Sequence, residues 1–154
     1  MIRQFHPGDA PSCCALIHAC LENDPSYTPE LLRIIRSSET PQSIMERAKL
    51  FYIAVYESED RIVGMAGLDM NEIRLLYVSP DCRRKGIGRL LLEHIKSMVP
   101  RVLFADIFVY SSKQAVAFYK ACGFVDKGPF TFDVAGEALQ TVFMTFPIPS
   151  SGSL

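Results

Sequence analysis

Val78-Ser-Pro-Asp-Cys-Arg-Arg-Lys-Gly-Ile-Gly-Arg-Leu-Leu-Leu-Glu93 is the stretch that decides how this chain of 154 residues is interpreted. A strand ends at Val78, Pro80 interrupts it, and a helix begins around Gly86 and Gly88. Glycines lack the Cβ that would keep a phosphate away from the backbone. The start of a helix offers unpaired N–H groups and the positive end of the helix dipole. Because three cations, Arg83, Arg84 and Lys85, directly precede the helix, the stretch predicts a diphosphate-binding site.

Two other phosphate-binding motifs do not fit the residues of this stretch. A P-loop requires Lys-Ser/Thr after its last glycine, whereas Arg89-Leu90 follows Gly88. A dinucleotide-binding turn requires a third glycine, and that position is Leu91. A helix cap surrounded by solvated charges is the remaining alternative to a phosphate site.

The order Arg83-x-x-Gly86-x-Gly88, after Val78-x-Pro80, resembles the acetyl-CoA-binding signature of the GNAT superfamily of N-acetyltransferases. A later stretch, AVAFYKACGF at residues 115–124, resembles the A-x-x-F-Y-x-x-x-G-F segment of the same family. Two motifs in the right order are far more specific than either alone. The resemblance implies an acyltransferase that uses acetyl-CoA as its acyl donor, with a GNAT fold over roughly residues 1–147.

Composition sets bounds on the class of protein. With 49% hydrophobic and 21% charged residues, the chain is expected to form one folded domain. Its net charge of −1 argues against a nucleic-acid partner. The sequence has neither a long apolar run nor a signal-peptide core, so we expect no membrane association and a cytoplasmic location. The five cysteines show neither a disulfide framework nor zinc spacing, so no metal is expected.

The periodicity of apolar residues predicts an α/β (α+β) fold with a mixed, mostly antiparallel central sheet and helices on both faces. We expect one domain over residues 1–147 and a flexible tail over 148–154, which is rich in Pro, Ser and Gly. The expected helices are 9–23, 30–37, 41–50, 87–98 and 113–122, and the expected strands are 2–5, 51–56, 61–68, 72–78, 102–109, 124–125 and 140–146.

Residue roles follow from the resemblance. Backbone groups of Leu76 and Val78 would bind the pantetheine arm, and the Val78 N–H would polarise the acetyl carbonyl. Tyr119 would be the general acid that protonates the leaving thiolate, and its alternative role is aromatic packing on the sheet. Many relatives have Asn where this chain has Ser112, which caps a helix but offers fewer hydrogen bonds. The donor-binding set is therefore Leu76, Val78, Arg83, Arg84, Lys85, Gly86, Ile87, Gly88, Arg89 and Ser112.

Glu72, six residues before Val78, resembles in position the catalytic glutamate of histone-acetylating members of the superfamily. Strand alternation places it on one face with Arg74, Leu76 and Val78, so Arg74 could pair with it. This arrangement suits a general base, and it equally suits a surface ion pair with water carrying the proton. Asp106 interrupts an apolar run, so it needs a partner or a role at the acceptor site.

The acceptor is expected to be an amine-bearing small molecule or peptide. Residues 16–50 and the loops near 130–137 would form its walls, as in relatives. A non-catalytic acyl-CoA-binding or sensing module is the main alternative, and a nucleic-acid-binding domain is a weaker one. Homodimerisation is common in the family, and no residue decides it here.

Overall fold

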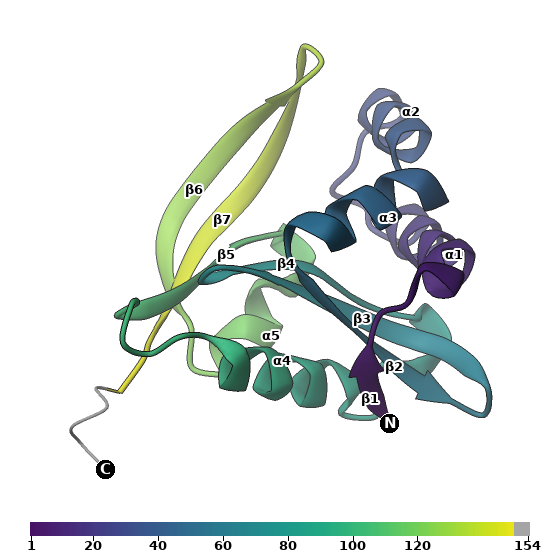
Figure 1. Ribbon diagram of the computed structural model, residues 1–154. Helices are drawn as coiled ribbons and strands as arrows, with labels where there is room; N and C mark the ends of the chain where they lie inside the picture. The colour runs from purple at the N-terminus through teal and green to yellow at the C-terminus, as the bar shows by residue number, and fades with distance from the viewer. Residues whose placement is uncertain (150–154) are drawn as a thin grey trace.

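The computed structural model describes residues 1–149, which build a seven-stranded sheet with helices on both faces (Figure 1). The strand order is β1-β2-β3-β4-β5-β7-β6, and only the β4–β5 neighbours are parallel. The predicted mixed, mostly antiparallel sheet is therefore confirmed. The strands are β1 Ile2–Gln4, β2 Tyr52–Ser58, β3 Arg61–Asp69, β4 Glu72–Val78, β5 Asp106–Ser111, β6 Val125–Val134 and β7 Glu137–Pro147.

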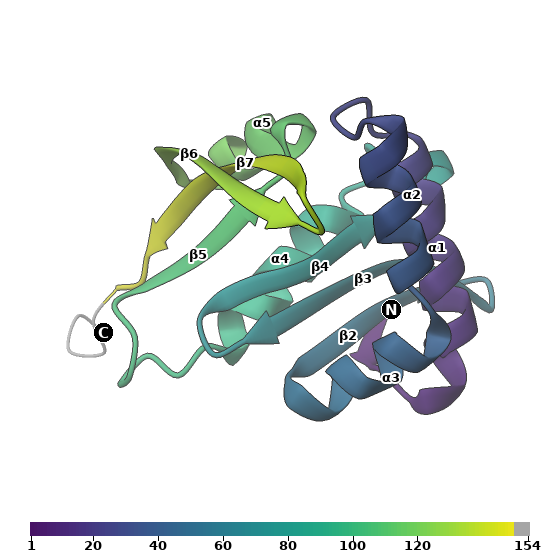
Figure 2. The same cartoon turned by 90° about the horizontal axis from the view of Figure 1, so that it is seen from above.

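Three helices cover one face of strands β2–β4: α1 Ala10–Glu22, α2 Pro29–Ser38 and α3 Pro41–Leu50. Both α2 and α3 begin with a threonine cap followed by proline, since Thr28 accepts a hydrogen bond from the Leu31 N–H and Thr40 from the Ser43 N–H. Figure 2 shows these helices grouped at one end of the sheet. Their buried face packs on Ile53, Val55 and Met65, among others.

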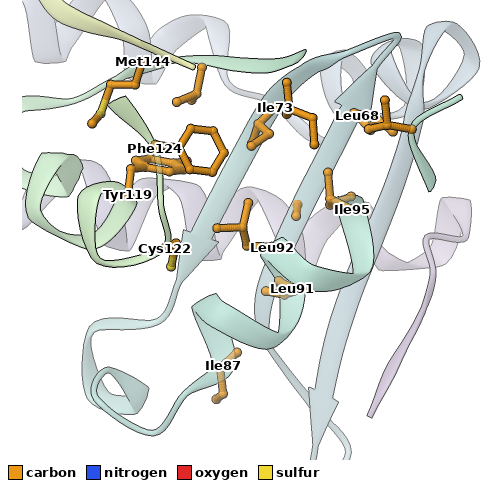
Figure 3. Packing of buried hydrophobic residues seen from close by; sticks show 14 of the residues in the cluster. Leu68, Ile73, Ile87, Leu91, Leu92, Ile95, Tyr119, Cys122, Phe124 and Met144 are labelled. Atoms are coloured by element: carbon orange, nitrogen blue, oxygen red, sulfur yellow. The ribbon is translucent and has the colours of Figure 1, made fainter. Parts of the chain in front are cut away.

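The opposite face carries α4 Ile87–Met98 and α5 Val116–Ala121. Ile87, Leu91, Leu92 and Ile95 of α4 are buried at helical spacing, and Figure 3 shows them packed against the sheet. Met98, the last residue of α4, is 45% exposed. The same core contains Tyr119, Cys122 and Phe124 of the α5 region together with Met144 of β7.

The prediction of a strand over residues 102–109 was wrong at its start. Strand β5 begins only at Asp106, and Val102 and Leu103 are 84% and 71% exposed. The N–H groups of Leu103 and Phe104 instead donate to the Pro100 carbonyl, which forms a turn after α4. An apolar run alone does not distinguish an exposed turn from a buried strand.

The last two strands are much longer than predicted. β6 and β7 form a hairpin that rises from the sheet on the side of α2 and α3 (Figure 1), so most of the expected loops near 130–137 are strand. The turn consists of Ala135 and Gly136, which both have positive φ. Pro129 does not end β6, because the register shifts between Asp126 and Pro129.

The chain remains attached to the sheet just beyond β7. The Ile148 N–H donates to the Ala105 carbonyl at 2.9 Å, and Ile148 packs on the core below α4 and α5. Residues 150–154 of the expected flexible tail lie outside the described residues. Within residues 1–149, none of the helices combines the length and apolar character needed to cross a bilayer.

Candidate active site

Strands β4 and β5 separate soon after they meet. Within residues 1–149, Glu72 and Phe108 are the only pair of residues in register between them, and the Phe108 N–H donates to the Asn71 carbonyl. Beyond this point the backbone edge of β4 has no neighbouring strand, and Figure 2 shows the two strands diverging. The β4–β5 opening is our name for this space between residues 73–78 and 109–112.

Along the edge of β4 that borders the opening, the backbone groups have no partner on a neighbouring strand within the described part of the chain. Val78 lies opposite Gly64, and the Ser79 N–H donates to the Val63 carbonyl at 2.8 Å. This pattern makes Gly64 and Val78 a non-hydrogen-bonded pair, so the Val78 N–H and C=O point away from β3. Leu76, two residues earlier, follows the same alternation. Both predicted backbone-binding residues thus line the opening.

A β-bulge at Leu75 corrects the predicted alternation along β4. Leu75 has φ of 58°, and the register with β3 shifts between Met65 and Gly67. Leu76 and Val78 therefore pack on the α4 side of the sheet, whereas Leu75 and Tyr77 pack on the α1 side. Arg74, over the Phe51 ring, also lies on the α1 side. Glu72, two residues before Arg74, thus lies on the face opposite to Leu76 and Val78.

The predicted diphosphate site lies at the start of α4, beside the end of β4. Gly86 caps the helix with φ of 83°, a left-handed conformation that favours glycine. The first helical bond runs from the Leu90 N–H to the Gly86 carbonyl, so the N–H groups of residues 87–89 have no acceptor within the helix. The Ile87 side chain is buried, while the cations around these N–H groups are exposed: Arg83, Arg84, Lys85 and Arg89.

Gly88 has a second structural reason to be glycine. A Cβ at this position would lie 3.3 Å from Cε1 of Phe118 and 3.6 Å from Cγ2 of Val78. The missing side chain therefore lets the first turn of α4 approach α5 and the end of β4 closely. Gly86, by contrast, has open space around it.

The Val78 carbonyl is held by two side chains from different elements. The Cys20 thiol of α1 donates to it at 3.3 Å, and the Arg83 Nε–H donates at 3.4 Å. Burial raises the pKa of Cys20, and Arg83 opposes this shift. Cys20 is therefore a neutral donor that fixes the end of β4, rather than a reactive thiol.

Ser112 follows β5 and acts as a helix cap, as expected. Its side chain accepts a hydrogen bond from the Ala115 N–H at 3.3 Å, and Ser111 beside it is buried. Cys82, in the turn before α4, is the one cysteine among residues 1–149 that is not buried. Arg61 lies 3.5 Å from its sulfur.

Tyr119 is almost wholly buried, with 4% of its surface exposed. Its ring packs between Phe118 and Phe124, with a centroid distance of 5.2 Å to each, and Figure 3 shows it beside Phe124. Burial raises its pKa far above the ordinary value, so the hydroxyl stays protonated. Among the described residues, every wholly buried side-chain oxygen or nitrogen has a hydrogen-bond partner. The Tyr119 hydroxyl has none among them, so it is not wholly buried. The Tyr119 oxygen therefore reaches the edge of the core.

The predicted ion pair between Glu72 and Arg74 is not formed. Arg74 pairs with Asp69 at 3.2 Å instead. Partial burial raises the pKa of Glu72, Arg74 opposes this shift, and Asp69 adds to it. A carboxylate with a raised pKa is a better proton acceptor than an exposed one. Among residues 1–149 Glu72 thus forms no ion pair, and partial burial keeps its pKa raised.

Asp106 has the partner that its place in the sequence required. Asn71 Nδ2 donates to the Asp106 carboxylate at 3.3 Å and to its backbone carbonyl at 3.0 Å. Asp106 and Phe108 alternate with the buried Ile107, so both face the α1 side of the sheet.

Tyr77 is a residue of this region that sequence analysis missed. It packs with Tyr27 and Leu75 on the α1 side of β4, and burial raises its pKa. Alternation without the bulge places Tyr77 on one face with Ile73 and Leu75, whereas the bulge separates it from Ile73, so no sequence signal pointed to the α1 side.

The rings of Phe108, Tyr110 and Phe143 were also missed, although Phe108 and Tyr110 have the spacing of one strand face. Phe130 and Phe132 lie in the expected acceptor wall near residues 130–137.

Known proteins resemble this chain in sequence and in fold. The family model described as an acetyltransferase (GNAT) domain matches residues 23–138. The peptidyl-lysine N-acetyltransferase YjaB of Escherichia coli is 34% identical over 111 residues, which are 72% of this chain and 69% of YjaB.

Two solved structures illustrate the likeness of fold. A GCN5-related N-acetyltransferase from Rhodopseudomonas palustris is 23% identical with a TM-score of 0.88, covering 96% of this chain and 95% of that one. A phosphinothricin acetyltransferase from Sinorhizobium meliloti, solved in complex with AcCoA, is 20% identical with a TM-score of 0.72, covering 99% and 90%. The family match, with the opening and the helix start described above, shows that this chain belongs to the GNAT superfamily and is an N-acetyltransferase.

Proposed function

We propose that this enzyme transfers an acetyl group from acetyl-CoA directly to a primary amine. The observation that carries the proposal is the β4–β5 opening, in which the unpaired backbone edge at Val78 leads to the unpaired N–H groups of residues 87–89. A long donor with an amide-containing arm and a diphosphate needs these two kinds of group in this order.

The donor set fits each part of acetyl-CoA. Leu76 offers its backbone N–H and C=O groups to the pantetheine arm, whereas Val78 offers its N–H, since its carbonyl already accepts from Cys20 and Arg83. The start of α4 and the exposed cations from Arg83 to Arg89 offer N–H groups and positive charge to the diphosphate. Ser112, on the far side of the opening, offers one hydroxyl whose oxygen already accepts from Ala115.

The proposed chemistry uses three groups of this chain. Glu72 accepts a proton from the acceptor ammonium, directly or through water, and the neutral amine attacks the thioester carbon. The Val78 N–H donates to the carbonyl oxygen as negative charge develops there. The new C–N bond forms, and the C–S bond breaks as Tyr119 donates to the leaving sulfur. The nitrogen then loses its second proton to water, and the Tyr119 oxygen regains a proton from solvent. The products are the N-acetylated amine and the free thiol.

The raised pKa of Tyr119 does not by itself prevent this last step. A phenol in water is a weaker acid than a thiol. A thiolate released beside the buried ring, however, meets the same desolvation, which raises its proton affinity as well. Tyr119 then stabilises the leaving sulfur by a hydrogen bond or by full proton transfer.

The acceptor is an amine carried by a small molecule or a peptide. The name of the relative YjaB supports a lysine side chain in a peptide. Glu72 supports a cationic acceptor in general, because its carboxylate attracts an ammonium group.

The first experiment is a calorimetric titration with acetyl-CoA. We expect binding by the wild type and its loss in the triple variant Arg83→Ala, Gly86→Ala, Gly88→Ala. A control variant, Arg101→Ala with Gly8→Ala, removes an exposed cation and a glycine with open surroundings, and should bind like the wild type. Absence of binding by the wild type would refute the proposal.

A screen of amines, followed by release of the free thiol, then tests catalysis. The departure at Ser112 favours one competing function, an acyl-CoA-binding or sensing module without turnover. Donor binding with no thiol release for any amine in the panel would support that module instead. Salt-dependent binding to DNA or RNA would point to the weaker alternative of a nucleic-acid-binding domain.

A further inference from the structure

Five aromatic side chains gather on the sheet face that turns away from α4 and α5. Tyr110 is central, with its ring centroid 5.0 Å from that of Phe130, 4.9 Å from Phe132 and 5.2 Å from Phe143. Phe108 completes the group, 5.9 Å from Tyr110 and 5.7 Å from Phe143. We call these five residues of β5, β6 and β7 the aromatic cluster.

The aromatic cluster belongs to neither hydrophobic core. Its strand neighbours Ile107, Val109 and Met144 point to the other face and are buried there. The cluster rings themselves stay partly accessible, and Phe130 is 45% exposed. Burial in the protein core therefore does not explain this concentration of rings. Grouped, accessible apolar side chains on one face are typical of a binding surface.

The position of the cluster links it to the proposed base. Phe108 lies in register with Glu72 across the only β4–β5 pair among the described residues. Asp106 shares the face of Phe108 and Tyr110, because the three alternate along β5. Carboxylates therefore occupy one end of this face, and the rings extend from them towards the β6–β7 hairpin.

Helix α2 bounds this face together with the hairpin. Helix α2 contacts β7, and Figures 1 and 2 show α2 and the hairpin rising from the same side of the sheet. Four of the five rings are only partly accessible and Phe130 is exposed, so the most accessible surface of the cluster is that of a single ring.

We propose that the acceptor is an arylalkylamine, a primary amine joined to an aromatic ring by a short alkyl linker; this rests on the proposed acetyl transfer. Its ammonium lies beside Glu72 and Phe108, and its ring packs on Tyr110 and Phe130 with edge-to-face or tilted geometry. Residues two apart on a strand are separated by about 6.6 Å, which is the distance that the linker has to cover. A linker of about two or three carbons fits this distance.

The test compares two amines that differ in the ring. We expect kcat/KM for 2-phenylethylamine, measured by thiol release, to exceed that for n-butylamine about tenfold or more. In Phe130→Ala this ratio should fall towards one, mainly through KM for the aryl amine. Tyr110→Leu keeps an apolar side chain and should reduce the ratio less. Leu103→Ala removes an exposed apolar side chain outside the site and should preserve the ratio.

Equal kcat/KM for the two amines in the wild type, or a ratio unaffected by Phe130→Ala, would overturn the arylalkylamine proposal while leaving acetyl transfer intact. A lysine peptide preferred over both amines more than tenfold would also overturn it. If no amine is acetylated, the proposed function fails separately. Calorimetric titration of 2-phenylethylamine into the CoA-saturated protein then tests the aromatic cluster, and absence of binding would reject it.

Discussion

At the scale of single residues, burial determines the protonation of two side chains of the candidate site. Burial raises the pKa of both Tyr119 and Glu72, but the consequences differ. A raised pKa keeps the Tyr119 phenol protonated, as a donor must be. In Glu72 it strengthens the affinity of the carboxylate for a proton, as a base requires.

Tyr119→Phe removes one hydroxyl and keeps the ring that packs between Phe118 and Phe124. We expect kcat to fall by about 100-fold or more, because donation to the leaving sulfur is lost. The Kd for acetyl-CoA, measured by calorimetry, should change less than about twofold. An unaltered kcat would remove Tyr119 from the chemistry and leave it as a packing residue.

Glu72→Gln should abolish the rise of kcat/KM with pH that reflects ionisation of the base. In the wild type this acidic limb lies above the ordinary glutamate pKa, because burial raises the pKa of Glu72. A pH–rate profile from pH 4 to 9 measures it. An acidic limb that is identical in both proteins would assign the proton to water alone.

Glu72→Gln should also change how the stability of the protein depends on pH. Because the folded-state pKa of Glu72 is raised, its contribution is fully present below the unfolded-state pKa and is lost as pH rises through the folded-state pKa. Glutamine does not titrate. The Tm of Glu72→Gln relative to the wild type should therefore be higher at pH 7 than at pH 4, by calorimetry. A constant difference between the two pH values would contradict this.

At the scale of elements, the contact between α4 and α5 connects the donor-binding region to the proposed acid. Gly88→Ala would place a Cβ 3.3 Å from the Phe118 ring, and overpacking of this kind costs about 1–3 kcal/mol. Since Phe118 precedes Tyr119, we expect a lower Tm and a lower kcat. The double variant Gly88→Ala, Phe118→Leu provides space for the methyl group and should recover part of both losses. A double-mutant cycle with no coupling would show that the two residues act independently.

The sequence predicted most elements because their signals were local. The helices α2 and α3 were expected to start at residues 30 and 41, and the structure shows a threonine cap followed by proline at each start. The glycines at 86 and 88 indicated the start of α4. The bulge at Leu75 was not predicted, because a positive φ in a non-glycine residue leaves no mark in composition. The predicted ion pair between Glu72 and Arg74 was wrong because Arg74 pairs with Asp69 across a turn, and strand alternation does not reveal such a contact.

The long hairpin shows a different limit. Gly128 and Pro129 are typical of a turn, yet a register shift accommodates them inside β6. The aromatic cluster depends on pairing of β5, β6 and β7, which sets residues far apart in sequence side by side. Such pairing is determined by the whole sheet and not by any one segment.

At the scale of the whole molecule, the sheet consists of β1–β4 and β5–β7, joined by one residue pair. A donor bound in the opening would contact both parts. At an acetyl-CoA concentration 100 times Kd, binding to the folded state alone contributes about 2.7 kcal/mol. For a domain of this size we expect Tm to rise by roughly 5–10 °C in a thermal melt. The triple variant at residues 83, 86 and 88 should show little change under the same conditions.

The opening between β4 and β5 also has a consequence for turnover. After acetyl transfer, the spent donor still holds every backbone and diphosphate contact that secured it before, since only its terminal acyl group has gone. Departure of the free coenzyme must therefore break nearly the same interactions that captured the substrate. If the donor binds as proposed, the geometry that captures it retains the product equally well, so we expect slow coenzyme release and competitive inhibition by the free coenzyme.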